Sequence, residues 1–208
     1  MNRLSGVRAV LFDMDGTLVD SDAAVERAWR MWLQEYGFDP EVPVAGIHGS
    51  PTEVTVRRLR PDLNDEEVRD AVSRQMAPQY DDLGDTVATP GAQALLKTLA
   101  ELNLPWAVVT SADARLAHAR LVSAQIHPDI LVTSDDIATG KPDPEGYLLA
   151  ARRLNHEPVH CLVVEDAEPG VQAGQAAGCL VAGLKGVPCD LKLDDLSELD
   201  DLLRRSRA

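Results

Sequence analysis

The chain has 208 residues, a net charge of -14 and a sequence pI near 4.6. This length allows one large domain with an inserted module, and the acidic balance argues against nucleic acid or an anionic membrane as a partner. No stretch is long enough to span a bilayer and no signal peptide is recognisable, so we expect a cytoplasmic protein. Three cysteines form no metal-ligand pattern, which favours a reducing setting. We also expect a monomer.

The first predicted element is a strand, because the apolar run from Val7 to Phe12 has the length and composition of a buried strand. The next part of the chain, residues 19–87, contains no convincing strand. Helices are predicted there, separated by prolines, at Asp20–Tyr36, Thr52–Arg60 and Asp65–Tyr80. This pattern predicts a helical module inserted after the first strand.

From about Thr89 onward, helices and apolar strands alternate. The expected strands are Trp106–Thr110, Ile130–Thr133, Cys161–Val164 and Leu180–Gly183, and the expected helices lie near residues 90–99, 114–122, 144–154, 169–177 and 190–205. Such alternation is typical of an α/β fold with a doubly wound parallel sheet. We therefore predict a core of residues 1–18 and 88–208, with residues 19–87 as the helical module.

The first strand is followed directly by the segment Asp13-Met14-Asp15-Gly16-Thr17. Two carboxylates thus stand at the carboxyl end of a strand, the edge where open α/β sheets bind ligands. Adjacent carboxylates repel each other, so a cation between them would explain the pair. An ordinary turn is the alternative interpretation.

Three further segments follow in order. Val108-Val109-Thr110-Ser111 is a strand that ends in hydroxyls, Gly140-Lys141-Pro142-Asp143-Pro144 places a lysine in a proline-rich turn, and Leu162-Val163-Val164-Glu165-Asp166 is a strand that ends in acids. With the first segment, these motifs resemble those of the haloacid dehalogenase superfamily of phosphotransferases. The resemblance implies its Rossmann-like core, and the inserted module resembles the small α-helical cap of one branch.

The resemblance also implies roles for the acidic residues. Asp13 would be the nucleophile that forms an aspartyl-phosphate, and Asp15 would be the general acid and base. Mg²⁺ would be held by Asp13, the backbone carbonyl of Asp15 and Asp166, with Glu165 supporting it through a water. Turn formation or helix capping is the alternative for Asp15, Glu165 and Asp166.

Phosphate binding is expected at the second and third motifs. Lys141 would place a positive charge between the nucleophile and the phosphate, and Ser111 would donate a hydrogen bond to a phosphoryl oxygen, unless it only caps the next helix. The backbone amides of Met14, Asp15 and Ala112 would contribute further donors. Members of the family often have a cis peptide bond at the Lys-Pro step.

In the module, the segment Gly46-Ile47-His48-Gly49-Ser50-Pro51-Thr52 is a candidate substrate-binding loop, with His48 as the specificity residue or, alternatively, an ordinary loop histidine. Related sugar-phosphate phosphatases frequently have Arg where this chain has Ser50, which puts a second polar contact in doubt, although Arg57 or Arg58 could supply it. Trp29, Trp32 and Tyr36 recur at helical spacing, which indicates a core for the module rather than a sugar-binding platform.

These features predict a Mg²⁺-dependent phosphatase acting on a small phosphorylated metabolite, a sugar or polyol phosphate. A phosphosugar mutase resembling β-phosphoglucomutase is the alternative, because it would share every core residue. A phosphonate hydrolase of the same branch is disfavoured. Such an enzyme uses a lysine of the cap to form a Schiff base, and this chain has no lysine before Lys97. A catalytically silent binding protein is also disfavoured, because none of the four motifs has lost its key residue.

Overall fold

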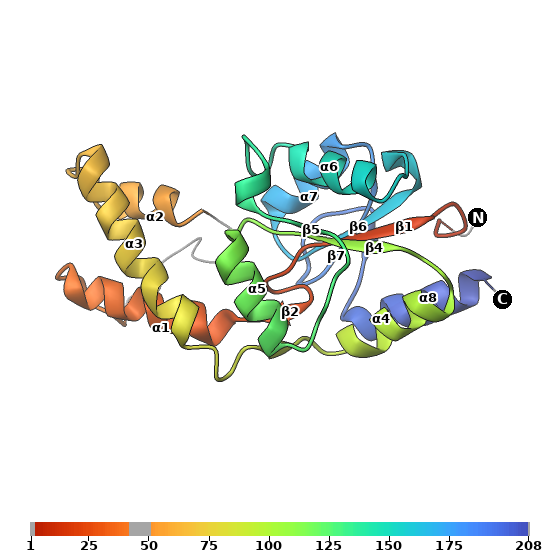
Figure 1. Cartoon of the computed structure of the whole chain (residues 1–208), viewed down its shortest axis with the longest axis horizontal. Coiled ribbons are helices and arrows are strands. Elements are labelled where there is room, and N and C mark those ends of the chain that lie inside the picture. The colour runs from red at the N-terminus through yellow and green to blue at the C-terminus, as the bar shows by residue number, and fades with distance from the viewer. Residues whose placement is uncertain (1–2, 42–50, 208) are drawn as a thin grey trace.

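The structure is a computed structural model that describes residues 3–41 and 51–207. Among these residues, six parallel strands form one sheet in the order β5-β4-β1-β6-β7-β8 (Figure 1). Their bounds are β1 Ala9–Phe12, β4 Trp106–Val109, β5 Leu131–Val132, β6 Cys161–Glu165, β7 Leu180–Gly183 and β8 Leu191–Lys192. The predicted α/β fold with a parallel sheet is confirmed.

Helices cover both faces of this sheet, which explains why β1 is an uninterrupted apolar run whose residues are all buried. One face carries α4 and α8, which pack side by side and share a hydrophobic core with part of α5, and the other carries α6 and α7. Their bounds are α4 Ala92–Glu101, α5 Ala114–Ser123, α6 Glu145–Arg153, α7 Glu168–Ala176 and α8 Leu196–Arg207, with short 3₁₀ turns at Ser134–Asp136 and Pro158–His160.

Three helices stand apart from the sheet at one end of the molecule, and we call them the cap (Figure 1). They are α1 Asp22–Glu35, α2 Thr52–Leu59 and α3 Asp65–Asp81. Trp29 and Trp32 of α1 are buried in a separate hydrophobic cluster against α2 and α3, with Tyr36 packed on it. The Trp32 indole donates a hydrogen bond of 2.9 Å to the carbonyl of Ala71 in α3. The predicted aromatic core of the module is therefore confirmed.

A two-stranded antiparallel ribbon lies where the chain enters and leaves the cap. Its strands are β2 Val19–Asp20 and β3 Val87–Ala88. Sequence patterns did not predict it, because two residues are too few to show a strand period. The ribbon lies at the two predicted joints of the module, whose boundaries at residues 18/19 and 87/88 stay a prediction.

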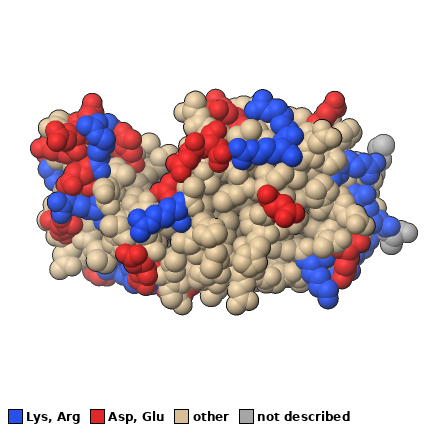
Figure 2. Space-filling model, viewed as in Figure 1, with Lys and Arg blue, Asp and Glu red and all other residues tan. Residues whose placement is uncertain are grey.

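Smaller differences occur near the end of the chain. The final helix begins at Leu196 rather than near Asp190, because residues 191–192 form β8 at the edge of the sheet. Cys161 and Cys179 are buried. In the described ranges, no helix has the length and apolarity needed to cross a membrane. Figure 2 shows the cap and the core as two lobes with an indentation between them, and charged side chains gather on the cap lobe.

Candidate active site

The acidic residues of the first and fourth motifs meet at the carboxyl edge of the sheet. Strands β1 and β6 are neighbours with Phe12 opposite Val164, and the amide of Asp13 continues the pairing with a hydrogen bond of 3.0 Å to the carbonyl of Val164. Carboxylate oxygens of Asp13, Glu165 and Asp166 consequently lie within 4.8 Å of one another. The fold thus brings together acids from two motifs that lie near opposite ends of the sequence.

The turn after β1 depends on Gly16. Its φ of 80° lies in the left-handed region, and a Cβ atom there would stand 2.1 Å from Oδ2 of Asp166. Any side chain at this position would therefore displace the Asp166 carboxylate and strain the backbone. The glycine of the first motif allows the turn to approach the acid of the fourth.

Lys141 inserts its ammonium group among these acids. Its Nζ donates to Oδ1 of Asp13 at 2.5 Å, to Oε1 of Glu165 at 2.6 Å and to the carbonyl of Val109 at 3.1 Å. The peptide bond between Lys141 and Pro142 is cis. The lysine side chain is 10% exposed, so the third motif delivers a buried positive charge to the strand ends.

Glu165 is 1% exposed and has a second buried partner, Tyr147 of α6. The Tyr147 hydroxyl donates to Oε1 of Glu165 at 2.6 Å. Gly170 leaves room for this carboxylate, since a Cβ there would lie 1.7 Å from Oε1. Sequence reasoning missed Tyr147; its only signal was its place in the helix that follows Lys141.

Burial and nearby charges set the protonation behaviour of this group. Burial raises the pKa of Asp13 well above its ordinary value, against the attraction of Lys141, and the charges of Glu165 and Asp166 add to the rise. Burial alone would lower the pKa of Lys141, but the carboxylates of Asp13 and Glu165 outweigh it and raise that pKa. The three acids lie close together, and a bound divalent cation would offset the negative charge that nearby lysines leave on them.

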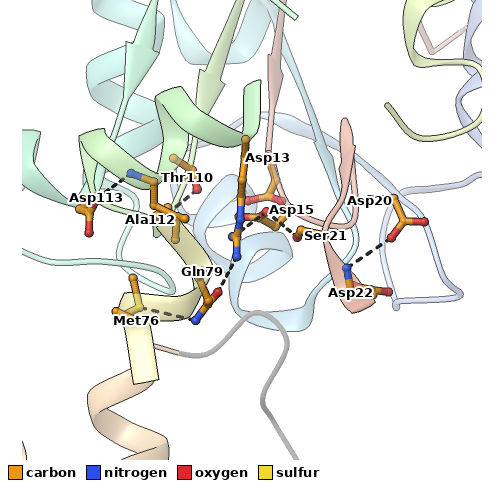
Figure 3. Close-up of polar contacts among 12 residues, drawn as sticks. Asp13, Asp15, Asp20, Ser21, Asp22, Met76, Gln79, Thr110, Ala112 and Asp113 are labelled. Atoms are coloured by element: carbon orange, nitrogen blue, oxygen red, sulfur yellow. Dashed lines mark hydrogen bonds and ion pairs between the residues drawn. The ribbon is translucent and has the colours of Figure 1, made fainter. Parts of the chain in front are cut away.

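Asp15 lies apart from this cluster, on the wall that faces the cap. Its Oδ1 accepts a hydrogen bond from the Ser21 hydroxyl at 2.7 Å and forms an ion pair with Nη1 of Arg120 at 2.8 Å. Figure 3 shows Asp15 and Ser21 facing each other beside Gln79 of the cap. Sequence reasoning missed Ser21 and Arg120, because neither belongs to a motif and Arg120 lies within an ordinary amphipathic helix.

The predicted phosphate-binding residues surround the same space. Ser111 is exposed at the end of β4 and lines the cleft with Ala112. The amide of Ala112, a predicted hydrogen-bond donor to the phosphate, instead donates to the Thr110 hydroxyl of the same loop at 3.1 Å (Figure 3). The side chain of Met14 is fully buried in the core of the sheet. The predicted residue His48 lies outside the described residues.

A cleft of about 830 Å³ separates the cap from the strand ends. Asp13, Lys141 and Asp166 line it from the core, and Trp29 and Met76 line it from the cap. The cap closes against α5 at one side, where the Tyr80 hydroxyl donates to Oδ2 of Asp113 at 2.5 Å. The arrangement can enclose a small molecule whose charged end reaches the acids and whose remainder contacts the cap.

On the opposite side of the acid cluster, Lys185 joins the core to the base of the cap. Its ammonium lies 3.1 Å from Oδ2 of Asp166 and 3.3 Å from Oδ2 of Asp22 in α1. Burial raises the pKa of Asp166, while Lys185 opposes the rise. Sequence reasoning did not identify this lysine either.

Comparison with known proteins gives consistent results. The sequence model of the haloacid dehalogenase-like hydrolases matches residues 7–178. Hexitol phosphatase A from Escherichia coli is 39% identical over 94% of this chain and 90% of its own length, and 2-deoxyglucose-6-phosphate phosphatase 1 from Saccharomyces cerevisiae is 33% identical over 84% and 78%. A hydrolase from Pseudomonas syringae with a solved structure is 28% identical, with a TM-score of 0.82 over 95% of this chain and 98% of that one.

Proposed function

Because the chain belongs to the haloacid dehalogenase-like hydrolases, we propose that it is a Mg²⁺-dependent phosphatase that cleaves a small sugar or polyol phosphate through an aspartyl-phosphate. The predicted family resemblance is confirmed, as is the prediction of an enzyme of the HAD-like phosphatase kind. The nature of the substrate, the cation and the role of each residue are parts of the proposal. The cytoplasmic location and the monomeric state stay predictions.

The observation that carries the proposal is the environment of Asp13. Its side chain is 10% exposed, borders the cleft and is held by Lys141 at 2.5 Å. A carboxylate fixed in this way needs little reorganisation to attack the phosphorus atom of a substrate bound in the cleft. The buried lysine charge would lower the repulsion between that carboxylate and the phosphate dianion.

The donor set suits Mg²⁺. Asp13 and Asp166 present hard carboxylate oxygens at the ends of adjacent strands, and these are the ligands that this ion prefers. We propose that they hold the ion with the backbone carbonyl of Asp15. When bound, the ion would neutralise charge on the phosphoryl oxygens. Glu165 is already engaged by Lys141 and Tyr147, so we propose an indirect contribution for it.

In the first step, an oxygen of Asp13 bonds to phosphorus while the bond from phosphorus to the ester oxygen breaks. The leaving alkoxide needs a proton, and we propose that Asp15 donates it. Asp15 lines the same cleft as Asp13 and is partly exposed, at 29% for its side chain. Ser111, which lines the cleft at the end of β4, would donate a hydrogen bond to a phosphoryl oxygen.

In the second step, the ionised Asp15 accepts a proton from a water molecule. The oxygen of that water bonds to phosphorus, and the bond from phosphorus to Asp13 breaks. Inorganic phosphate is released and both side chains return to their starting states. The cap would exclude bulk water during the first step and must admit one water for the second.

The substrate class is inferred from the relatives and the size of the cleft. The relatives above are named for hexitol phosphate and deoxyglucose phosphate hydrolysis. A cleft of about 830 Å³, lined by both polar and apolar side chains of the cap and the core, is large enough for such a molecule. His48 remains the proposed specificity residue of the cap.

A phosphate-release screen tests the proposal. The purified protein with Mg²⁺ should release phosphate from at least one member of a panel of hexitol, hexose, glycerol and short-acid phosphates. The Asp13→Asn variant, prepared in the same way, sets the background. Absence of release above that background from the whole panel would contradict the proposal. Isomerised sugar phosphate without phosphate release would instead support the mutase alternative.

A further inference from the structure

One buried arginine connects the proposed general acid to the cap. Arg120 of α5 is 4% exposed, and its Nη1 lies 2.8 Å from Oδ1 of Asp15. Its Nη2 donates to Oε1 of Gln79 at 2.5 Å. Gln79 belongs to the cap helix α3 and is also 4% exposed. A single guanidinium therefore joins Asp15 on the core to the cap across the edge of the cleft.

These contacts fix the orientation of the Asp15 carboxylate. Arg120 and the Ser21 hydroxyl both bind Oδ1, so among the described contacts Oδ2 is the oxygen left for exchanging a proton with a ligand in the cleft. Proton transfer to a leaving group requires hydrogen-bond distance and correct direction. Two donors on one oxygen restrict the rotation of a carboxylate that would otherwise sample several orientations.

The link to the cap is itself supported. Gln79 donates from its amide nitrogen to Oε1 of Gln75 at 2.8 Å, and Gln75 is fully buried. Figure 3 shows Gln79 projecting from the cap helix toward the space beside Asp15. The remaining Nε–H of Arg120 has no partner in the part of the chain that the structure describes. A buried donor without a partner is unfavourable, so an arrangement of the guanidinium that engages this Nε–H would be favoured.

We infer that Arg120 is a positioning residue for Asp15 and that Gln79 makes this positioning depend on the placement of the cap. This inference rests on the proposed role of Asp15 as general acid and base. The cap would then contribute to proton transfer as well as to exclusion of water. Movement of α3 relative to α5 changes the position of Gln79, and through Arg120 it changes the direction of the Asp15 carboxylate.

The experiment compares two kinds of substrate in the Arg120→Met variant. An alkyl phosphate needs a proton on its leaving oxygen in the first step, whereas 4-nitrophenyl phosphate has a stable leaving group and does not. We expect kcat/KM for the alkyl phosphate to fall about 100-fold, the lower end of general acid catalysis, and kcat/KM for the aryl phosphate to fall less than about fivefold.

Arg115→Met is the matched control. Arg115 lies on the same helix and also contacts the cap, with its guanidinium 4.1 Å from the centre of the Tyr80 ring, but its side chain is 70% exposed and pairs with Asp81 rather than Asp15. The ratio of alkyl to aryl kcat/KM should stay within about twofold of the parent value. Thermal unfolding of each variant verifies that the comparison is made between folded proteins.

Two further variants keep the inference testable if Arg120→Met does not fold. Gln79→Met leaves the pair between Arg120 and Asp15 in place and removes the link to the cap, so the ratio should fall several-fold in the same direction. Arg120→Ala should recover part of its alkyl activity when guanidinium ion is added at millimolar concentration. Neither effect is expected if the arginine only holds the helices together.

Equal losses with both substrates in Arg120→Met and Gln79→Met would overturn the inference and leave a structural role. A rise in KM with unchanged kcat for both substrates would also overturn it, in favour of direct substrate binding. Failure of the proposed function is distinct, because the parent protein would then release no phosphate above the Asp13→Asn background.

Discussion

The ammonium group of Lys141 lies 2.5 Å from Oδ1 of Asp13, although 128 positions separate these residues along the chain. The contact is buried, with both side chains 10% exposed, and the lysine also holds Glu165 at 2.6 Å. One ammonium group therefore pairs with two carboxylates at the floor of the cleft. This relationship makes Lys141 important for stability as well as for the proposed chemistry.

Replacing this lysine should damage both properties. Lys141→Met leaves Asp13 and Glu165 buried without their cation, and breaking such a group by removing one partner costs about 3–5 kcal/mol. We expect the free energy of unfolding in urea to fall by about that amount and turnover to fall at least about 100-fold. Lys97→Met is the control, because Lys97 is 78% exposed and should change stability by less than about 0.5 kcal/mol. An unchanged free energy of unfolding in Lys141→Met would mean that the lysine is not needed to offset the buried charges of Asp13 and Glu165.

Asp13→Asn tests the nucleophile. The amide has nearly the same shape, so the fold should persist, but it cannot form an aspartyl-phosphate. We expect turnover to fall by at least about 1000-fold with little change in the thermal midpoint. Phosphate release under substrate saturation and circular dichroism of the same sample measure the two effects. Activity within tenfold of the parent would show that another group attacks phosphorus.

Chelation tests the cation. The clustered acids Asp13 and Asp166 should bind Mg²⁺, so EDTA should abolish phosphate release and added Mg²⁺ should restore it. Ca²⁺ should substitute poorly because its coordination shell is larger and looser. Calorimetric titration measures Mg²⁺ binding independently of activity. In this experiment, the Asp166→Asn variant should bind Mg²⁺ more weakly than the parent protein. Full activity after exhaustive chelation would contradict this prediction.

Because two thiols are buried, we expect the free energy of unfolding to decrease at high pH. Burial raises the pKa of Cys161 to about 11 and that of Cys179 to about 12, from an ordinary value of 9.0. The folded protein keeps protons that the unfolded chain loses, so this stabilisation is complete below pH 9 and disappears as the pH rises toward 12.

The urea midpoint should therefore fall between pH 8 and pH 10.5, with each thiol contributing on the order of 2 kcal/mol to the change. The double variant Cys161→Ala, Cys179→Ala should start less stable at pH 8 because of its cavities, and only its smaller change between the two pH values matters. An equal change in parent and double variant would exclude the thiols as the cause.

The parts of the site that the sequence predicted share a local signal. Asp13 and Asp166 follow uninterrupted apolar strands, and Gly140 and Pro142 mark the turn that carries Lys141. Parallel strands end at the same edge of a sheet, so strand ends predict proximity without knowledge of the full fold. The same kind of local pattern predicts the α/β core and the helical module.

The parts that the sequence did not predict depend on packing between distant elements. Arg120 meets Gln79 across 41 positions and Tyr147 meets Glu165 across 18, and both lie on helices whose pattern is explained by ordinary burial. The ribbon of β2 and β3 is formed by strands of two residues, too short for any period to show. These features become visible only when elements that are distant in the sequence are brought together in three dimensions.

The roles of the two acids of the first motif can be distinguished with a substrate whose leaving group needs no proton. If Asp13 attacks and Asp15 transfers protons, Asp15→Asn should impair protonation of the leaving group and also activation of water. With 4-nitrophenyl phosphate the first step needs no proton, so the variant should form the phosphoenzyme quickly and hydrolyse it slowly. Rapid-quench mass spectrometry should then find phosphate accumulating on Asp13.

The Asp13→Asn protein is the matched control for this accumulation, because it lacks the carboxylate that accepts the phosphoryl group and should remain unmodified. The parent protein should show only a small steady-state fraction, since its intact Asp15 activates water for the second step. Two results would contradict the assignment: normal turnover of alkyl phosphates by Asp15→Asn, or no phosphoenzyme in that variant with the aryl substrate. In the first case another group would have to transfer the protons, and in the second the phosphatase proposal could survive only with water attacking phosphorus directly.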